Sequence, residues 1–257
     1  MIYDNIDKLI KSNSDELLVF CVANYPVIKF VENLLISAEK IGINVVVFCL
    51  DETITQELNN KMDVELVRHK SLNFIDSNKC SEFGSRNFGN IVFERFFISK
   101  YLLKNGRSIV YTDVDVVFCR DFREDIKNHL LENDFVCQTE WLPRRKKQNR
   151  GCTGFFAMKP SPNLIKFFEE KSMKKKKYQK YNTNQKFINR YFNGFQVNPI
   201  CTTKLLLKED YPNGICYKRM SQVRKECYII HFNCEVGIEK KMNFMKKYKK
   251  YFLKDIN

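Results

Sequence analysis

The chain lacks the short glycine motifs that mark several large classes of enzyme. Its 257 residues include only nine glycines, and no two of them form a Gly-x-Gly pair. No dinucleotide-binding Gly-x-Gly-x-x-Gly, phosphate-binding P-loop or Gly-x-Ser-x-Gly pattern occurs, which argues against the nucleotide and hydrolase sites that depend on them. With three histidines in the whole chain, a zinc site built from several imidazoles is disfavoured.

Long apolar runs and paired cysteines are also missing. No stretch approaches the roughly 20 apolar residues that span a bilayer. Residues 1–8 carry acids and have no apolar core, so they do not resemble a signal peptide. The ten cysteines form no Cys-x-x-Cys pair and are scattered through apolar segments, which is typical of reduced core thiols. We therefore expect a soluble, cytoplasmic protein in a reducing compartment.

The composition does supply a core and a strong positive charge. Hydrophobic residues make up 44% of the chain and aromatic residues 14%, and the net charge is +14. Such a charge favours anionic partners. We find no repeat and no linker, so residues 1–257 are expected to form one domain, with a basic helical segment over about 239–257.

Buried strands alternate with helices along the first half of the chain. Residues 17–23 read as a strand, 28–38 have helical spacing, and 44–50 form the next apolar run. A second helix over 88–104 is followed at once by another apolar run. This alternation predicts an α/β fold with a mixed, mostly parallel sheet and helices on both faces.

Two acids interrupt the apolar run at 108–118. If the run is one extended strand, Asp113 and Asp115 project to the same side of it. Two carboxylates on one side suit Mn²⁺ or Mg²⁺, ions that usually complete their shell with substrate phosphates. The alternative is that the strand ends at Asp113 and that both acids are solvated in a turn.

Four elements in a fixed order resemble a known family. Asp113-Val114-Asp115 is followed by a small-Gly-Phe strand at 152–158, an Asn-Gln pair opening a helix at 184–189, and His231-x-Asn with Gly237-x-x-Lys. Over roughly residues 15–241 this resembles the GT-A nucleotide-diphospho-sugar transferases, in particular the group that includes plant and protist α-xylosyl- and α-galactosyltransferases. The resemblance implies a GT-A, Rossmann-like single domain.

The resemblance also assigns site residues. It implies a metal held by Asp113, Asp115 and His231, although His231 could be an ordinary buried histidine. It implies catalytic roles for Asp113, Asp115, Asn184 and Gln185, and donor-binding roles for Ala23, Asn24, Arg95, Asp113, Gly154 and Lys240. Several of these have simpler readings, since Asn24 could cap a helix, Gly154 could form a bulge, Gln185 could be a polar helix-start residue and Lys240 could be solvated.

Two positions depart from the family pattern. Asn184 stands where the family usually has an acid, and it does not ionise, so a carboxylate role there is in doubt. Arg95 stands where the family usually has a lysine, and it keeps the charge. Glu140 is a weak candidate on the acceptor side, and Trp141 could stack on a sugar or belong to the core.

Together these features predict a metal-dependent glycosyltransferase. It would move a sugar from a UDP- or GDP-sugar to a glycan or protein acceptor, and the resemblance implies retention of configuration. Two alternatives are a HAD-like phosphatase, whose acidic motif also follows a strand, and a basic nucleic-acid-binding module. The acidic motif lies in mid-chain here and no nucleic-acid signature occurs, so we expect no nucleic-acid partner. The sequence leaves the oligomeric state open.

Overall fold

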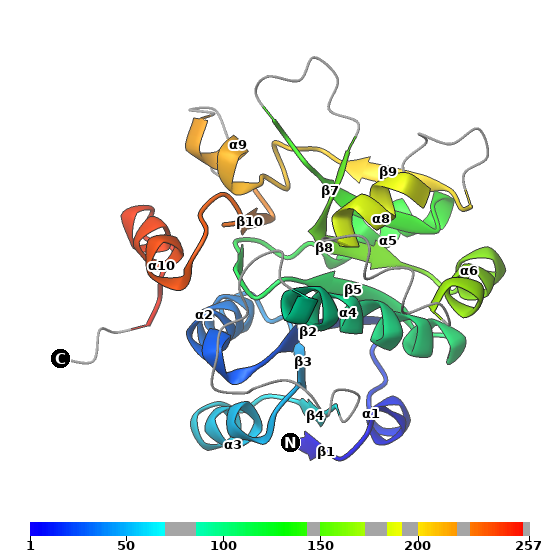
Figure 1. Ribbon diagram of the computed structural model, residues 1–257, viewed down its shortest axis with the longest axis horizontal. Helices are drawn as coiled ribbons and strands as arrows, with labels where there is room; N and C mark the ends of the chain where they lie inside the picture. The colour runs from blue at the N-terminus through cyan, green and yellow to red at the C-terminus, as the bar shows by residue number, and fades with distance from the viewer. Residues whose placement is uncertain (70–85, 143–149, 173–183, 192–199, 220–226, 254–257) are drawn as a thin grey trace.

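The computed structural model describes residues 1–69, 86–142, 150–172, 184–191, 200–219 and 227–253. Its main feature is an eight-stranded sheet with the order β1-β4-β3-β2-β5-β8-β7-β9 (Figure 1). The strands of this sheet are β1 Ile2–Tyr3, β2 Leu17–Ala23, β3 Val46–Cys49, β4 Leu66–Arg68, β5 Ser108–Thr112, β7 Phe135–Thr139, β8 Gly151–Met158 and β9 Thr203–Leu206. Two further strands, β6 Val116–Phe118 and β10 Ile229–His231, form a separate antiparallel pair.

The helices connect these strands and cover them. They are α1 Ile6–Ser12, the 3₁₀ turn η1 Tyr25–Val27, α2 Ile28–Glu39, α3 Glu52–Lys61, α4 Arg86–Lys104, α5 Arg123–Glu132, α6 Pro162–Ser172, α8 Asn184–Tyr191, α9 Gly214–Arg219 and α10 Ile238–Lys247. Strands β1 to β5 of the main sheet pair in parallel, β8 runs antiparallel to β5 and β7, and β9 is parallel to β7. The expected mixed, mostly parallel α/β sheet is thus confirmed.

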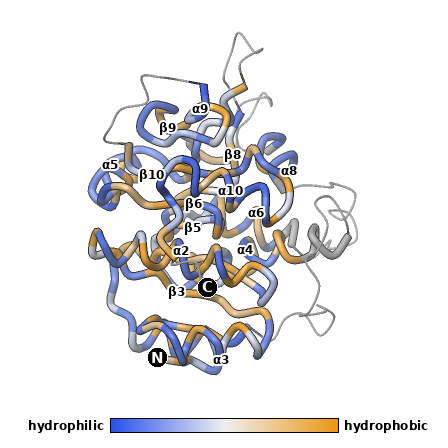
Figure 2. The backbone as a smooth tube through the Cα atoms, turned by 90° about the vertical axis from the view of Figure 1, so that its left-hand side faces the viewer, coloured by the Kyte–Doolittle hydropathy of each residue, from blue (hydrophilic) through white to orange (hydrophobic). Residues whose placement is uncertain are grey.

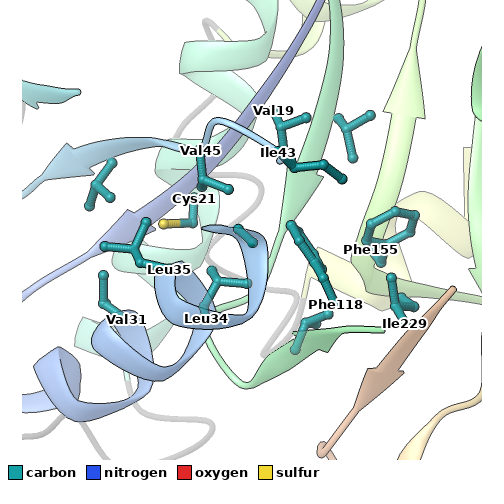
Figure 3. Close-up of a cluster of buried hydrophobic side chains, with 14 of the residues drawn as sticks. Val19, Cys21, Val31, Leu34, Leu35, Ile43, Val45, Phe118, Phe155 and Ile229 are labelled. Carbon is teal, nitrogen blue, oxygen red and sulfur yellow. The ribbon is translucent and has the colours of Figure 1, made fainter. Parts of the chain in front are cut away.

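Alternate strand residues face opposite layers of helices. Odd-numbered residues of β2 pack with α2 and α3, and even-numbered residues pack with α4. Figure 3 shows Cys21 of β2 beside Leu35 of α2, in the cluster that also contains Val19 and Leu34. Because both faces of the sheet are covered, β2 and β3 read as continuous apolar runs, and the tube through β3 is coloured hydrophobic in Figure 2.

The C-terminal part builds a smaller third core. Val117 of β6, Ile230 of β10 and Phe244 of α10 pack with Phe30 of α2. In Figure 1, α10 lies on the α2 side of the molecule, away from α6 and α8. Buried Asn33 of α2 fixes the tail there, because its amide donates to the Lys250 carbonyl at 3.0 Å and accepts from the Phe252 amide at 2.7 Å.

Several sequence expectations are corrected. The run at 108–118 is not one strand, because β5 ends at Thr112, a turn follows, and β6 joins the other sheet. The basic helix expected over 239–257 is α10 at Ile238–Lys247, and the chain then turns at Lys249, whose φ is 55°. The pattern beyond Gly194 predicts short strands and loops up to Ile229, but Gly214–Arg219 form the helix α9.

Other expectations fall where the structure gives no description. The polar residues 70–87, which include Gly84, predict a loop. Residues 70–85 lie outside the described part of the chain, and residues 86 and 87 belong to α4. Two runs of lysine and arginine, at 144–147 and 174–177, underlie the nucleic-acid alternative, and both lie outside the described residues. Within the described part of the chain, no helix combines the length and the apolar character needed to cross a membrane.

Candidate metal centre

Two carboxylates and one imidazole converge at the carboxyl end of β5. Asp113, Asp115 and His231 each offer one ligand atom, and these atoms lie within 4.8 Å of one another. His231 Nε2 is 3.3 Å from Asp115 Oδ1 and 3.7 Å from Asp113 Oδ2. Asp115 and His231 are buried, whereas 32% of the Asp113 side chain is exposed. The cluster therefore has one side open to a ligand.

A turn, and not a straight strand, brings the two acids together. The Asp113 amide donates to the Gly154 carbonyl at 2.6 Å, and the Val116 amide donates to the Asp113 carbonyl at 3.3 Å. Beyond the turn, β6 pairs with β10, so that Val116 lies opposite His231. The Phe232 amide donates to the Asp115 carbonyl at 3.0 Å. The switch of the chain from one sheet to the other thus places both acids against the histidine.

One carboxylate oxygen of Asp113 already accepts two hydrogen bonds from the protein. Arg95 Nη1 and the Tyr111 hydroxyl donate to Asp113 Oδ1 at 2.8 and 2.6 Å. Arg95 also donates to the Thr153 carbonyl and hydroxyl of β8, and its side chain is 3% exposed. Burial and the nearby Asp113 carboxylate hold the pKa of Tyr111 well above its usual value, so that its hydroxyl remains a donor. This leaves Oδ2, the oxygen on the His231 side, to meet a ligand.

Asp115 is paired with a lysine of α10. Lys241 Nζ lies 2.5 Å from Asp115 Oδ2, and the two side chains are 20% and 10% exposed. Burial alone would raise the pKa of Asp115, but the Lys241 ammonium and the His231 imidazole hold that pKa well below its usual range. Conversely, the Asp115 carboxylate raises the pKa of Lys241 despite its burial. Both groups are therefore charged near neutral pH.

His231 is held by its other ring nitrogen. Gln138 Nε2 donates to the Tyr211 carbonyl at 3.0 Å, which leaves Gln138 Oε1 to accept from His231 Nδ1 at 2.9 Å. Nδ1 must then carry a proton, and Nε2 is the nitrogen that faces the two acids. Burial alone would lower the pKa of His231, but the Asp115 carboxylate raises it above its usual value.

The orientation of His231 Nε2 suits a metal ligand. Among the residues that the structure describes, this buried atom has no hydrogen-bond partner of acceptable geometry. A buried polar atom without a partner is costly. Two carboxylate oxygens and a neutral imidazole nitrogen form a donor set that suits Mn²⁺ or Mg²⁺. The residues present therefore fit a divalent cation.

Gly154 makes room for the imidazole. A Cβ built on this glycine would lie 1.9 Å from His231 Cε1 and 2.6 Å from Nε2. The pairing of β7 with β8 is also irregular here, because Cys137 faces Phe156 while the next residue, Gln138, faces Cys152. The irregular pairing agrees with the bulge expected at Gly154. The group that approaches this glycine closely is His231, so the expected donor-binding role of Gly154 stays a prediction.

The other predicted donor-binding residues lie at the same edge of the sheet or nearby. Ala23 and Asn24 are buried at the carboxyl end of β2. Asn24 stands at the start of η1 but makes no capping bond, and within the described residues its Nδ2 has no partner. Arg95 contacts Asp113 and β8, so its expected contact with phosphate stays a prediction.

The described hydrogen bonds of the predicted site residues in α8 and after β7 are made to partners outside the candidate metal centre. Gln185 Nε2 donates to Glu140 Oε1 at 2.6 Å, which joins two residues that the sequence had placed on the sugar or acceptor side. The side chain of Asn184 lies outside what the structure describes. Trp141 is partly exposed, and its carbonyl accepts from Asn213. Their roles remain predictions.

Sequence reasoning missed three residues that contact the cluster, namely Lys241, Gln138 and Tyr111. Lys240 is exposed, and its neighbour Lys241 is the lysine that contacts Asp115. No local pattern distinguishes two adjacent lysines, although the helical phase of α10 against its buried Phe244 and Met245 would have favoured one of them. Gln138 and Tyr111 carry no motif, because both read as ordinary strand residues.

Comparisons with known proteins agree with this geometry. The profile of the family described as nucleotide-diphospho-sugar transferase matches residues 42–245. A UDP-galactose:fucoside alpha-3-galactosyltransferase of Dictyostelium discoideum is 24% identical over 96% of this chain and 44% of its own length. A UDP-D-xylose:L-fucose alpha-1,3-D-xylosyltransferase of Arabidopsis thaliana is 23% identical over 93% of this chain and 71% of its own length. The chain thus spans less than half of the first relative.

A solved structure shares the fold. The galactosyltransferase LgtC, determined with donor and acceptor sugar analogues, superposes with a TM-score of 0.57 over 92% of this chain and 97% of its own. Its sequence is 10% identical, so this likeness establishes the GT-A fold alone.

Replacing Gly154 by alanine should displace His231. Because the new Cβ would overlap the imidazole, we expect Gly154→Ala to lower the free energy of unfolding by about 1–3 kcal/mol, measured by urea denaturation. Gly89 of α4 is the matched control, since a Cβ there meets nothing within 4 Å, and Gly89→Ala should be neutral or slightly stabilising. An equal free energy of unfolding for Gly154→Ala and the wild type would contradict the close contact between Gly154 and His231.

Proposed function

The chain belongs to the nucleotide-diphospho-sugar transferase family, and from this premise we propose that it is a divalent-metal-dependent glycosyltransferase. The donor is a nucleotide-diphosphate sugar, UDP- or GDP-linked, and the acceptor is a glycan or protein. The observation that carries the proposal is the convergence of Asp113, Asp115 and His231, with His231 Nε2 buried and unpartnered in the described part of the chain.

The charges of the site support a diphosphate ligand. Asp113 and Asp115 carry two negative charges, and Arg95 and Lys241 carry two positive charges. A divalent cation that binds His231 Nε2 would displace the proton of that ring. The charges of the four other groups then cancel, and the cation leaves a net charge of about +2. That excess matches a diphosphate group. The cation, Mn²⁺ or Mg²⁺, would act as a Lewis acid for the leaving nucleoside diphosphate.

The chain's own residues hold this arrangement in place. Arg95 and Tyr111 fix Asp113 so that Oδ2 faces the cation site. Lys241 balances Asp115 and lies beside the cation site, where its ammonium is placed to donate to a phosphate oxygen. Stabilising charge that develops on the leaving group lowers the barrier to transfer. We assign to Lys241 the phosphate role that the sequence gave to Lys240.

The names of the two curated relatives refine the proposal. Both specify a UDP-sugar, an alpha linkage and a fucose or fucoside acceptor. We therefore propose a UDP-sugar as the first donor to test and an L-fucoside as the first acceptor. Both donor sugars are α-linked to UDP, so an alpha product means retention of configuration.

Neither alternative function receives support from these findings. A HAD-like phosphatase would not match the nucleotide-diphospho-sugar transferase profile. The basic runs that suggested nucleic-acid binding lie outside the described residues. The cytoplasmic location remains a proposal, supported by the nine described cysteines, all of which are free.

Loss of Asp115 should abolish turnover. We expect Asp115→Asn to reduce release of UDP from UDP-galactose or UDP-xylose by roughly 10²–10³-fold, because the amide is a poor ligand for a hard cation. Excess EDTA should do the same to the wild type, with Mn²⁺ restoring activity. Asp121→Asn is the matched control, since Asp121 is an exposed acid paired with Arg123. Full turnover in EDTA would contradict metal dependence.

Substitutions of the adjacent residues Lys240 and Lys241 should have different effects on UDP binding. Lys241→Met should weaken binding of UDP in the presence of Mn²⁺ by on the order of tenfold or more, because it removes a buried cation beside the site. Lys240→Met changes an exposed residue and should leave UDP binding unchanged. Isothermal titration calorimetry measures the dissociation constant of UDP for each variant. A larger loss of UDP affinity in Lys240→Met than in Lys241→Met would assign the phosphate role to Lys240.

Gln138 should control metal affinity without touching the metal. Gln138→Leu removes the oxygen acceptor for His231 Nδ1 and leaves the weaker acceptor Cys152 Sγ at 3.5 Å, and we expect Mn²⁺ to bind roughly 10–100-fold more weakly. Gln138→Glu retains an acceptor and should recover most of that loss. Calorimetric titration with Mn²⁺ checks both variants, and far-ultraviolet circular dichroism verifies folding. Unaltered Mn²⁺ affinity in folded Gln138→Leu would show that His231 does not need this partner.

A further inference from the structure

Two cysteines and a lysine meet at the end of the β6–β10 ladder that is remote from the candidate metal centre. Cys119 directly follows β6, and Cys227 lies two residues before β10. Their thiols are hydrogen-bonded to each other. Lys250 Nζ lies 3.4 Å from Cys119 Sγ. None of these three residues belongs to the site described above.

The backbone brings the two cysteines close together at the end of the ladder. The amides of Cys119 and Arg120 both donate to the Tyr228 carbonyl, at 2.8 and 3.2 Å. Two residues thus face one across the ladder, which is a β-bulge. Cys227 directly precedes Tyr228, so it lies one position from the residue that faces Cys119. Cys227 is part of the third core and Cys119 packs against that core, so the two side chains share one apolar cluster.

The lysine is fixed by the tail that carries it. The Lys250 amide donates to the Met245 carbonyl, and its carbonyl accepts from buried Asn33. The ammonium is thus held beside Cys119, and a nearby cation favours the thiolate form of cysteine. The hydrogen bond from Cys227, together with Lys250, outweighs burial and lowers the pKa of Cys119 to about 7.

The two thiols differ in character. Cys119 is partly exposed, whereas Cys227 is buried. The hydrogen bond to Cys119 and, second, burial raise the pKa of Cys227 far above its usual value. This asymmetry of an accessible thiolate beside a buried thiol is the arrangement in which one cysteine attacks and the other resolves.

We propose that Cys119 and Cys227 form a redox-active dithiol, in which Cys119 attacks a small disulfide and Cys227 then closes an intramolecular disulfide. With glutathione disulfide, the Cys119 thiolate forms a mixed disulfide and one glutathione thiolate leaves. Cys227 gives up its proton and attacks the Cys119 sulfur, and the second glutathione departs with a proton. The protein loses two electrons, and glutathione disulfide gains them.

This bond would cross-link the strand pair that carries the metal centre. Cys119 lies four residues after Asp115, and Cys227 lies four residues before His231. Because β6 and β10 are antiparallel, the dithiol and the acid–histidine cluster occupy opposite ends of one ladder. The disulfide would also close a long loop, so oxidation should raise the thermal midpoint of unfolding.

The test uses the full chain treated at pH 7 with oxidised glutathione, followed by peptide mass mapping. The wild type should form the 119–227 disulfide and retain no glutathione. Cys227→Ser should retain glutathione on Cys119, and Cys119→Ser should form neither product. Cys234, which is also partly exposed but whose pKa is raised by burial, is the internal reference and should react more slowly than Cys119.

Two lysine variants test the role of the ammonium. Lys250→Met should slow modification of Cys119 roughly fivefold at pH 7, because less of the thiol is ionised. Exposed Lys249→Met is the matched control and should leave the rate unchanged. The proposal is overturned if wild-type Cys119 reacts no faster than Cys234, or if the wild type keeps as much glutathione as Cys227→Ser does. Neither measurement depends on transferase activity.

Discussion

The structure depends on bringing two carboxylates next to a buried imidazole at a sheet edge. Like charges at short range in a poorly solvated site repel strongly. Arg95 from α4 and Lys241 from α10 supply the compensating charges. Each lies in a different element from the acids, so the main sheet, α4 and α10 must all be in place before the cluster is stable. The buried His231 Nε2 has no hydrogen-bond partner among the described residues and faces both acids, so the cluster fits a divalent cation.

The short ladder of β6 and β10 connects this cluster to the C-terminal part of the chain. Leaving the main sheet after Thr112 turns the backbone so that Asp115 and Val116 meet the His231 strand. The same ladder carries the Cys119–Cys227 pair at its far end. The tail then returns to α2 through Asn33, which fixes Lys250 beside Cys119. The small antiparallel sheet thus positions both the acid–histidine cluster and the pair of thiols.

Much of the fold could be predicted because burial on both faces leaves a strong local signal. The apolar runs at 17–23 and 44–50 became β2 and β3, and the start of α6 at Pro162 follows from Ser161-Pro162. The run at 108–118 misled because its apolar residues are buried in both strands, so composition gave no sign of the break. The C-terminal helix was overextended because Lys and aromatic residues continue past its end at Lys247.

The sequence by itself determined the alternation of strands and helices, the acidic pair and the order of motifs that identifies the family, because these depend on neighbouring residues. Only the tertiary structure decided which side chains contact the two acids and the histidine. Lys241 rather than Lys240 contacts Asp115 because adjacent helix residues point about 100° apart. Gln138 orients His231 across 93 residues of chain, and Gly154 makes room for its ring. Such contacts follow from the packing of separate elements, which no local pattern encodes.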